Sequence, residues 1–260
     1  MNDRPLSGPM LNKVPEVILY FWIIKILCTT VGETAADYLN TTMRFGLTQT
    51  TYVMGALLLA VLLVQLALRK YVPGIYWLAV VLLSIVGTLI TDNLTDHFGV
   101  SLVTTTLVFT AALAAVFVAW FASERTLSIR TIRTRRREAF YWLAVLFTFA
   151  LGTAAGDLAA EHFSLGYFPS AILFAAVIAG VGFAHLYMEM DAILAFWIAY
   201  VLTRPFGASV GDWLSQARGQ GGLGFGTTTT SLLFLATILA LVTYLTATRK
   251  DYGAAVKNAE

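Results

Sequence analysis

The sequence predicts an all-α integral membrane protein of eight transmembrane helices, arranged as four parallel two-helix repeats in two pseudo-symmetric halves, with both termini cytoplasmic. Three observations support this prediction. The 260 residues are 58% hydrophobic and only 12% charged, which lies outside the usual range of soluble domains. Eight apolar segments each approach the ~20 residues that cross ~30 Å of hydrocarbon. A pattern of tryptophan, glycine and aspartate recurs four times with fixed spacing.

The apolar segments follow one another along nearly the whole chain, and we expect each to form a helix. They are rich in Leu, Ala, Val, Phe and Ile without strict alternation, which favours helices over barrel strands. The first is too long for a cleavable signal peptide. Cys28 is the sole cysteine, which excludes disulfides within one chain. The segments lie at roughly 15–36, 50–68, 74–95, 101–122, 139–160, 168–187, 191–213 and 228–247.

Basic residues are concentrated on one side of the predicted bundle, the side shared by both termini and the second, fourth and sixth connections. The opposite side carries only Arg44 and Arg218. The positive-inside rule therefore predicts cytoplasmic termini, and we expect a multi-pass protein of the bacterial inner membrane. We interpret the basic run 125–137 as a topology anchor, with anionic lipid binding as the alternative. The basic residues of the terminal side are Arg4, Lys13, Arg69, Lys70, Arg125, Arg130, Arg133, Arg135, Arg136, Arg137, Arg249, Lys250 and Lys257.

Each repeat places a glycine ten residues after its tryptophan and an aspartate five residues after that glycine. Successive motif tryptophans are 55, 65 and 55 residues apart, so the extra residues fall in the basic central connection. Every unit has an even number of spans, which predicts a shared orientation and a pseudo-symmetry axis along the membrane normal. The expected divisions are tail 1–14, repeats 15–70 and 71–124, basic linker 125–138, repeats 139–190 and 191–248, and tail 249–260. The motif residues are Trp22, Gly32, Asp37; Trp77, Gly87, Asp92; Trp142, Gly152, Asp157; and Trp197, Gly207, Asp212.

Four tandem two-helix units, each with a tryptophan in its first helix, resemble a bacterial membrane-protein family catalogued as a repeat of unknown function, number 347. The resemblance covers the chain from about Val14 to Arg249 and rests on the Trp-to-Gly-to-Asp spacing. It implies an integral membrane protein of eight helices and no particular activity. The fourth unit departs from the others by a longer loop through Gly219 to Gly226, and the third carries Pro169 where the others have threonines.

The recurring aspartates are the strongest candidates for a functional site, because an acidic group in a membrane segment is expensive. Residues four apart share a helix face, so acids stack in three units and predict a carboxylate-lined path. The alternative is that the aspartates only cap helix ends near water. The predicted ion-binding or proton-coupling residues are Asp37, Asp92, Asp157, Asp212, Glu33, Asp96 and Glu161.

Other polar residues are candidates for supporting roles. Lys25 and Arg204 each lie two turns before an acid, where either neutralises that acid or extends to the interface. Hydroxyls that open the even segments are expected opposite the aspartates if each hairpin folds about its own loop, and they serve as helix caps or as ligands and proton relays. These candidates are Thr51, Thr105 and Thr228. We assign the motif tryptophans to anchoring or packing and the motif glycines to close helix approach, with an unwound segment as the alternative for the glycines.

Oxygen ligands from Asp, Glu and Thr suit hard cations such as Mg²⁺, Mn²⁺ or Ca²⁺. The predicted metal ligands are the four repeat aspartates, Asp37, Asp92, Asp157 and Asp212. His97 and His162 follow the second acids of the middle repeats. As ligands they would shift the preference towards Mn²⁺ or Zn²⁺, and an interfacial position without a ligand role is the open alternative.

The leading functional hypothesis is a proton-coupled transporter of a cation, of the divalent metal class. The position of the acids towards the outer mouth favours export. The alternatives are a proton-coupled transporter of a small organic solute and a non-transporting membrane sensor or scaffold. No phosphate-binding loop or hydrolase motif occurs in the sequence, so we predict no enzyme activity. We also predict no cofactor beyond the transported cation and no nucleic-acid partner. The bilayer, the cation and protons are the expected partners, and no oligomeric state is predicted.

Overall fold

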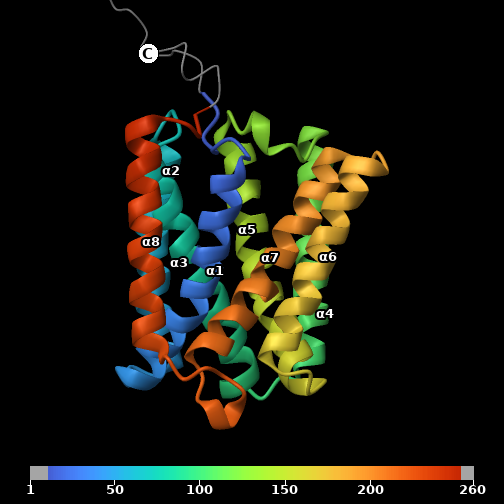
Figure 1. The fold of residues 1–260 in the computed structure, drawn as a ribbon. Coiled ribbons are helices and arrows are strands. Elements are labelled where there is room, and N and C mark those ends of the chain that lie inside the picture. The colour runs from blue at the N-terminus through green and yellow to red at the C-terminus, as the bar shows by residue number, and fades with distance from the viewer. Residues whose placement is uncertain (1–10, 253–260) are drawn as a thin grey trace, which may run out of the picture.

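The computed structural model describes residues 11–252 and is all-α over that range (Figure 1). Arg4, Lys257 and most of the two predicted tails lie outside the described residues. The observed helices agree with the predicted segments to within a few residues. They are α1 (Leu19–Asp37), α2 (Leu47–Ala67), α3 (Pro73–Asp92), α4 (Leu102–Glu124), α5 (Arg135–Asp157), α6 (Tyr167–Tyr187), α7 (Ala192–Ser215) and α8 (Thr227–Thr248).

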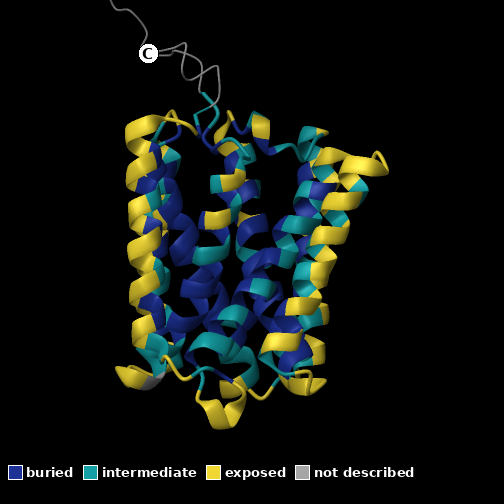
Figure 2. Cartoon of the chain, viewed as in Figure 1, coloured by how far each residue is buried: buried dark blue, intermediate teal, exposed yellow. Residues whose placement is uncertain are grey.

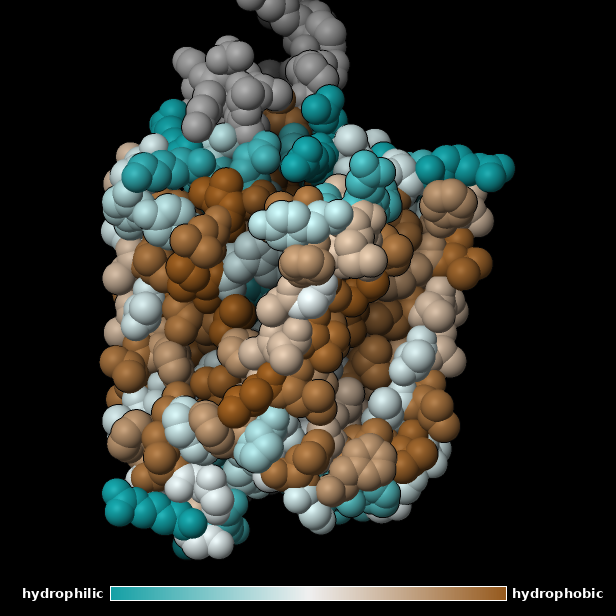
Figure 3. All heavy atoms as spheres, turned by 45° about the vertical axis from the view of Figure 1, so that its right-hand side comes forward, coloured by the Kyte–Doolittle hydropathy of each residue, from teal (hydrophilic) through white to brown (hydrophobic). Residues whose placement is uncertain are grey.

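All eight helices are long and apolar enough to cross a membrane. On the face drawn in Figure 3, a broad hydrophobic band lies between two hydrophilic ends. The two described ends of the chain lie on the same face (Figure 1), which we call the terminal side. The connections on that side carry exposed basic residues, including Arg69, Lys70, Arg125 and Arg130, as the repeat topology predicted.

The odd-numbered helices form a closed inner ring. Helix α1 packs against α3, α3 against α5, α5 against α7, and α7 against α1. The even-numbered helices lie outside this ring and expose most of their surface, whereas the odd helices are largely buried (Figure 2). The fourfold sequence repeat is therefore realised as a ring with its pseudo-symmetry axis along the bundle.

The even helices do not pack mainly against the odd helix of their own repeat, as simple hairpin folding predicted. Instead α2 lies against α3, α4 against α5, α6 against α7, and the last helix, α8, covers the first, α1. The odd helices bury their apolar sides against one another, and each even helix covers the outer side of the next odd helix around the ring. Each repeat is thus completed by its neighbour, and the chain ends interlock.

A single π-helical turn follows each aspartate in the first three repeats. These turns span Tyr38–Thr42, Asn93–His97 and Leu158–His162. The fourth repeat lacks such a turn and instead carries Pro205 inside α7, which removes one backbone N–H from the helix. These turns end the helical segments of α1, α3 and α5 and place the first three ring aspartates at a change of helical geometry.

Each motif glycine lies where one odd helix meets the next. A side chain at Gly32 would collide with Ser84 of α3, and one at Gly87 with Phe149 of α5. Gly152 abuts Arg204 and Pro205 of α7, and Gly207 abuts Thr29 of α1. The glycines therefore allow the four ring helices to approach one another closely, at one level of the bundle.

Gly32→Ala is expected to destabilise the protein by about 1–3 kcal/mol, the usual range for overpacking a core. The added Cβ would lie 2.9 Å from the backbone carbonyl carbon of Ser84, which cannot move without shifting α3. The matched control is Gly55→Ala in α2, where a Cβ meets nothing within 4 Å. Thermal unfolding in detergent should show a lower midpoint for the first variant only. Equal midpoints would contradict the close-approach role.

Candidate functional site

The four repeat aspartates surround the axis at one end of the ring. Asp37, Asp92 and Asp157 are the last residues of α1, α3 and α5, and Asp212 lies in the last turn of α7. Their carboxyl groups are close enough to interact electrostatically with one another and with Glu33. The ring thus brings together acids that are 55 to 175 residues apart in the sequence.

Three of these carboxyls form no hydrogen bond or ion pair with another described residue. Within residues 11–252, no ion pair or hydrogen bond is formed by the side chains of Asp92, Asp157 or Asp212, although Asp212 is buried. Asp37 accepts a hydrogen bond of 3.4 Å from Gln216. Gln216 lies four residues after Asp212, at the position where the two middle repeats have an acid. Since buried polar groups are normally paired, the Asp212 carboxyl is unusual in lacking such a partner among the described residues.

Arg204 is the centre of a fully buried polar cluster one turn below the aspartates. Its Nη2 donates to Glu33 Oε2 at 2.9 Å, to Thr153 Oγ1 at 2.7 Å and to Thr88 Oγ1, and its Nη1 donates to the Thr29 carbonyl at 3.1 Å. Glu33, Thr88 and Thr153 occupy equivalent positions, four residues before their aspartates. The fourth repeat has Ala208 there, so the arginine side chain fills the place that a fourth polar group would take.

Arg204 and Glu33 are both candidates from the sequence, but their spacing in the repeats did not predict that they pair with each other. Arg204 lies eight residues before Asp212, and the equivalent residues of the other repeats are Thr29, Ser84 and Phe149. Its long side chain crosses to the next level and binds residues of α1, α3 and α5 together. Ala208 was the feature of the sequence that could have predicted this cluster. Its small side chain leaves space that the longer side chain of Arg204, one turn earlier on α7, can fill.

Lys25 is also fully buried, and it contacts no carboxylate among the described residues. Its Nζ donates to the Tyr200 carbonyl at 2.9 Å and to Thr203 Oγ1 at 2.5 Å, and it lies 3.9 Å from the centre of the Tyr200 ring. This cation is held by a carbonyl, a hydroxyl and an aromatic face. Glu33, the acid two turns away on α1, is paired with Arg204 instead.

The second acids and the histidines lie outside the enclosed layer. Asp96, His97, Glu161 and His162 are all exposed at the end of the ring opposite the terminal side. The two imidazoles pack against the phenylalanines that follow them. Over residues 11–252 no three His, Cys, Asp or Glu side chains are arranged to hold a metal ion. A metal site built from three or more of these side chains would therefore require the aspartates to move closer together.

The even helices contribute a second set of equivalent hydroxyls, three residues after each helix begins. Thr50, Thr105, Ser170 and Thr230 are buried, and the first three have no hydrogen-bond partner among the described residues. Of the predicted hydroxyls, Thr105 belongs to this set, whereas Thr228 is exposed. Thr51 accepts a hydrogen bond of 2.8 Å from Asn93 of the next repeat. Only Ser101 caps an even helix, α4, with its side chain.

Aromatic side chains fill the ring between the polar cluster and the terminal side. Phe21, Tyr76 and Tyr141 precede the first three motif tryptophans and are buried. The two tyrosine hydroxyls are 2.5 Å apart, and Phe21 packs on Trp77. Trp77, Trp142 and Trp197 are likewise buried in this packing, and Trp22 is half-buried.

The N-terminal segment closes the terminal side over these aromatic residues. Backbone N–H groups of residues 11, 13 and 16 bond to the carbonyls of Arg69, Ile132 and Asp251. Lys13 forms a buried ion pair with Glu138, whose other oxygen accepts a hydrogen bond from Gln65 at 3.1 Å. Tyr71 donates to Asp251, and burial beside that carboxylate raises the pKa of the tyrosine. The axis is thus blocked on the terminal side of the acids.

The fold and this layered interior define a pseudo-fourfold ring of α-helices in which all eight helices are suited to span a membrane. The chain belongs to the family described as Repeat of Unknown Function (DUF347), whose repeats match residues 20–71, 75–126, 140–191 and 195–251. These matches confirm the four tandem units expected from the spacing of the motif. No curated protein and no solved structure matched the chain.

Proposed function

We propose that the protein is a proton-coupled transporter of a cation, of the divalent metal class, in the bacterial inner membrane. The observation that carries the proposal is the buried Arg204–Glu33 ion pair directly beside four equivalent aspartates on the ring axis. A buried pair that can be exchanged for another cation or for a proton is the kind of group that transporters place near the bilayer midplane.

The charges of the interior support the coupling to protons. Glu33 and the four aspartates supply five carboxyl groups, and Lys25 and Arg204 supply two positive charges. Carboxylates at short range cannot all stay ionised, so protons or a cation must join them. A cation that binds the aspartates competes with Arg204 for Glu33, and protonation of Glu33 frees Arg204. A cation that binds the aspartates also displaces the protons that they hold in its absence, so binding of the cation is linked to release of protons.

The fourth ring helix supports the conformational part of the proposal. Pro205, adjacent to Arg204, leaves α7 without one backbone hydrogen bond and provides a place for the helix to bend. Movement of Arg204 would therefore be transmitted to the helix that carries Asp212. With the basic side in the cytoplasm, the acids face the outer half of the membrane and the aromatic layer blocks the cytoplasmic half. Transport requires this layer to open.

A cargo screen tests the proposal against its alternatives. Cells that produce the protein should show a changed content of one divalent metal and a changed tolerance to it, compared with cells that carry the empty vector. A proton flux evoked by an organic amine and not by metals would favour the organic-solute transporter. No change with any cargo, in cells where the protein is shown to be in the membrane, would favour the sensor or scaffold.

A further inference from the structure

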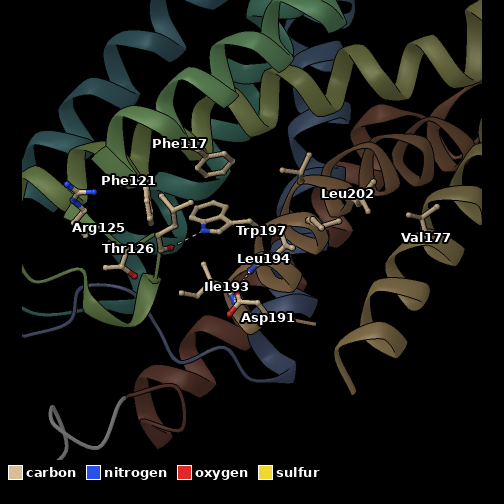
Figure 4. Close-up of a pocket in the computed structure, with 13 residues that line it drawn as sticks. Phe117, Phe121, Arg125, Thr126, Val177, Asp191, Ile193, Leu194, Trp197 and Leu202 are labelled. Atoms are coloured by element: carbon tan, nitrogen blue, oxygen red, sulfur yellow. Dashed lines mark hydrogen bonds between the residues drawn. The ribbon is translucent and has the colours of Figure 1, made fainter. Parts of the chain in front are cut away.

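Two apolar grooves flank α7 on the terminal half of the molecule. The first has a volume of about 720 Å³ and lies between α4, α6 and α7. In Figure 4, Phe117 and Phe121 of α4 lie on one side of it, Trp197 and Leu194 of α7 line its floor, and Val177 of α6 lies across from them. Its lining is almost entirely hydrocarbon and aromatic, which suits an acyl chain.

The second groove, of about 590 Å³, lies on the other side of α7, between α1 and α6 and beneath residues 128–130. It is lined by Trp22 and Phe196, among others, and shares Leu127 and Ile193 with the first groove. The two grooves therefore meet at the start of α7, under the connection that leads from α4 to α5. Two chains of one molecule could lie on either side of that helix.

Basic groups lie at the mouths of both grooves. Arg125 lines the first and Arg130 and His185 line the second, and both arginines are exposed. The single acid in either lining is Asp191, whose Oδ1 already accepts the N–H groups of the first turn of α7. The Trp197 indole donates to the Leu127 carbonyl at 3.0 Å and holds the basic connection over the grooves.

We propose that these grooves bind an anionic glycerophospholipid, with its acyl chains on either side of α7 and its headgroup phosphate at Arg125 and Arg130. Two apolar grooves that meet beneath one basic connection match two acyl chains joined at one anionic headgroup. Basic pockets between transmembrane helices on the cytoplasmic side are an established mode of anionic lipid recognition. This proposal does not depend on which cargo the ring carries.

Native mass spectrometry of the detergent-purified protein tests the proposal. The probes are dioleoylphosphatidylglycerol and dioleoylphosphatidylcholine, which share the same chains and differ in headgroup charge. We expect the anionic lipid to bind more tightly, and Arg125→Gln with Arg130→Gln to weaken it by about thirty-fold, with little effect on the zwitterionic lipid. The control, Arg133→Gln with Arg135→Gln, changes exposed arginines of the same connection that line neither groove and should bind as the unmodified protein does.

A second variant tests the apolar half of the site independently. Gly182 lines the second groove, and a Cβ there meets nothing within 4 Å, so Gly182→Phe fills the groove without displacing backbone. It should weaken both lipids. Brominated phosphatidylglycerol should also quench tryptophan fluorescence, less so in Trp197→Phe. Equal affinity for the two lipids, with no effect of the arginine pair or of Gly182→Phe, would overturn the proposal.

Discussion

Replacing Asp92 and Asp157 together with asparagine is expected to abolish cation movement and leave the protein folded. The loss should reach at least about 100-fold, the upper end of what removal of a residue supporting a metal ligand costs. Asparagine has nearly the same shape but carries no negative charge and has no carboxyl group to bind and release a proton. The two carboxyls form no ion pair or hydrogen bond within residues 11–252, so the fold does not depend on their charge. Uptake into vesicles that contain the purified variant measures the effect.

The matched control for this pair is Asp191→Asn. Asp191 is exposed on the terminal side, where it caps α7, and asparagine caps a helix equally well. This variant should transport at the unmodified rate. If Asp92→Asn with Asp157→Asn also transports at that rate, the aspartates are structural and the proposed function is wrong.

Replacing Arg204 with methionine is expected to cost about 3–5 kcal/mol of stability, because Glu33 would remain in the interior without its cation. Thr88 and Thr153 would also lose the donor that joins α3 and α5 to α1. Adding Glu33→Gln to this variant should restore much of the loss, since the buried negative charge that Arg204 had neutralised is then removed as well. Thermal unfolding of the two single variants and the double variant in detergent provides the comparison.

Lys25→Met separates the loss of an ion pair from the loss of any buried cation. Lys25 is as buried as Arg204 but contacts no carboxylate, and Thr203 Oγ1 keeps its own hydrogen bond to the Tyr200 carbonyl without it. Its replacement should therefore be close to neutral. Equal destabilisation by Lys25→Met and Arg204→Met, without recovery in the Glu33→Gln double variant, would show that Arg204 acts only by filling space.

The repeated motif was sufficient to predict the eight helices and the axis about which they are arranged. Hydrophobic run length fixes each helix, and the constant distance from tryptophan to aspartate places equivalent residues at one level. The pairing of even with odd helices was not predictable in this way. Every repeat offers the same apolar surface, so periodicity alone does not distinguish a helix packed on its own repeat from one packed on the next.

The site was predictable where it follows the symmetry and not where it breaks it. The convergence of the four aspartates follows from equivalent positions around the ring. The Arg204 cluster forms because one long side chain reaches Glu33, which occupies a different position in its repeat. Aligning equivalent positions of the repeats does not reveal such a contact. The pairing of Lys13 with Glu138 depends on an N-terminal segment outside the repeat, whose path no spacing in the motif specifies.

The exchange of protons for a cation in sealed vesicles tests the central claim most directly. Purified protein would be reconstituted with a pH-sensitive dye inside, and each divalent metal would be added outside. The proposed function predicts that one metal evokes a proton flux that is absent from vesicles carrying Asp92→Asn with Asp157→Asn and present with Asp191→Asn. A metal flux without any proton flux would contradict the coupling, and a proton flux that survives in the double variant would contradict the role of the aspartates.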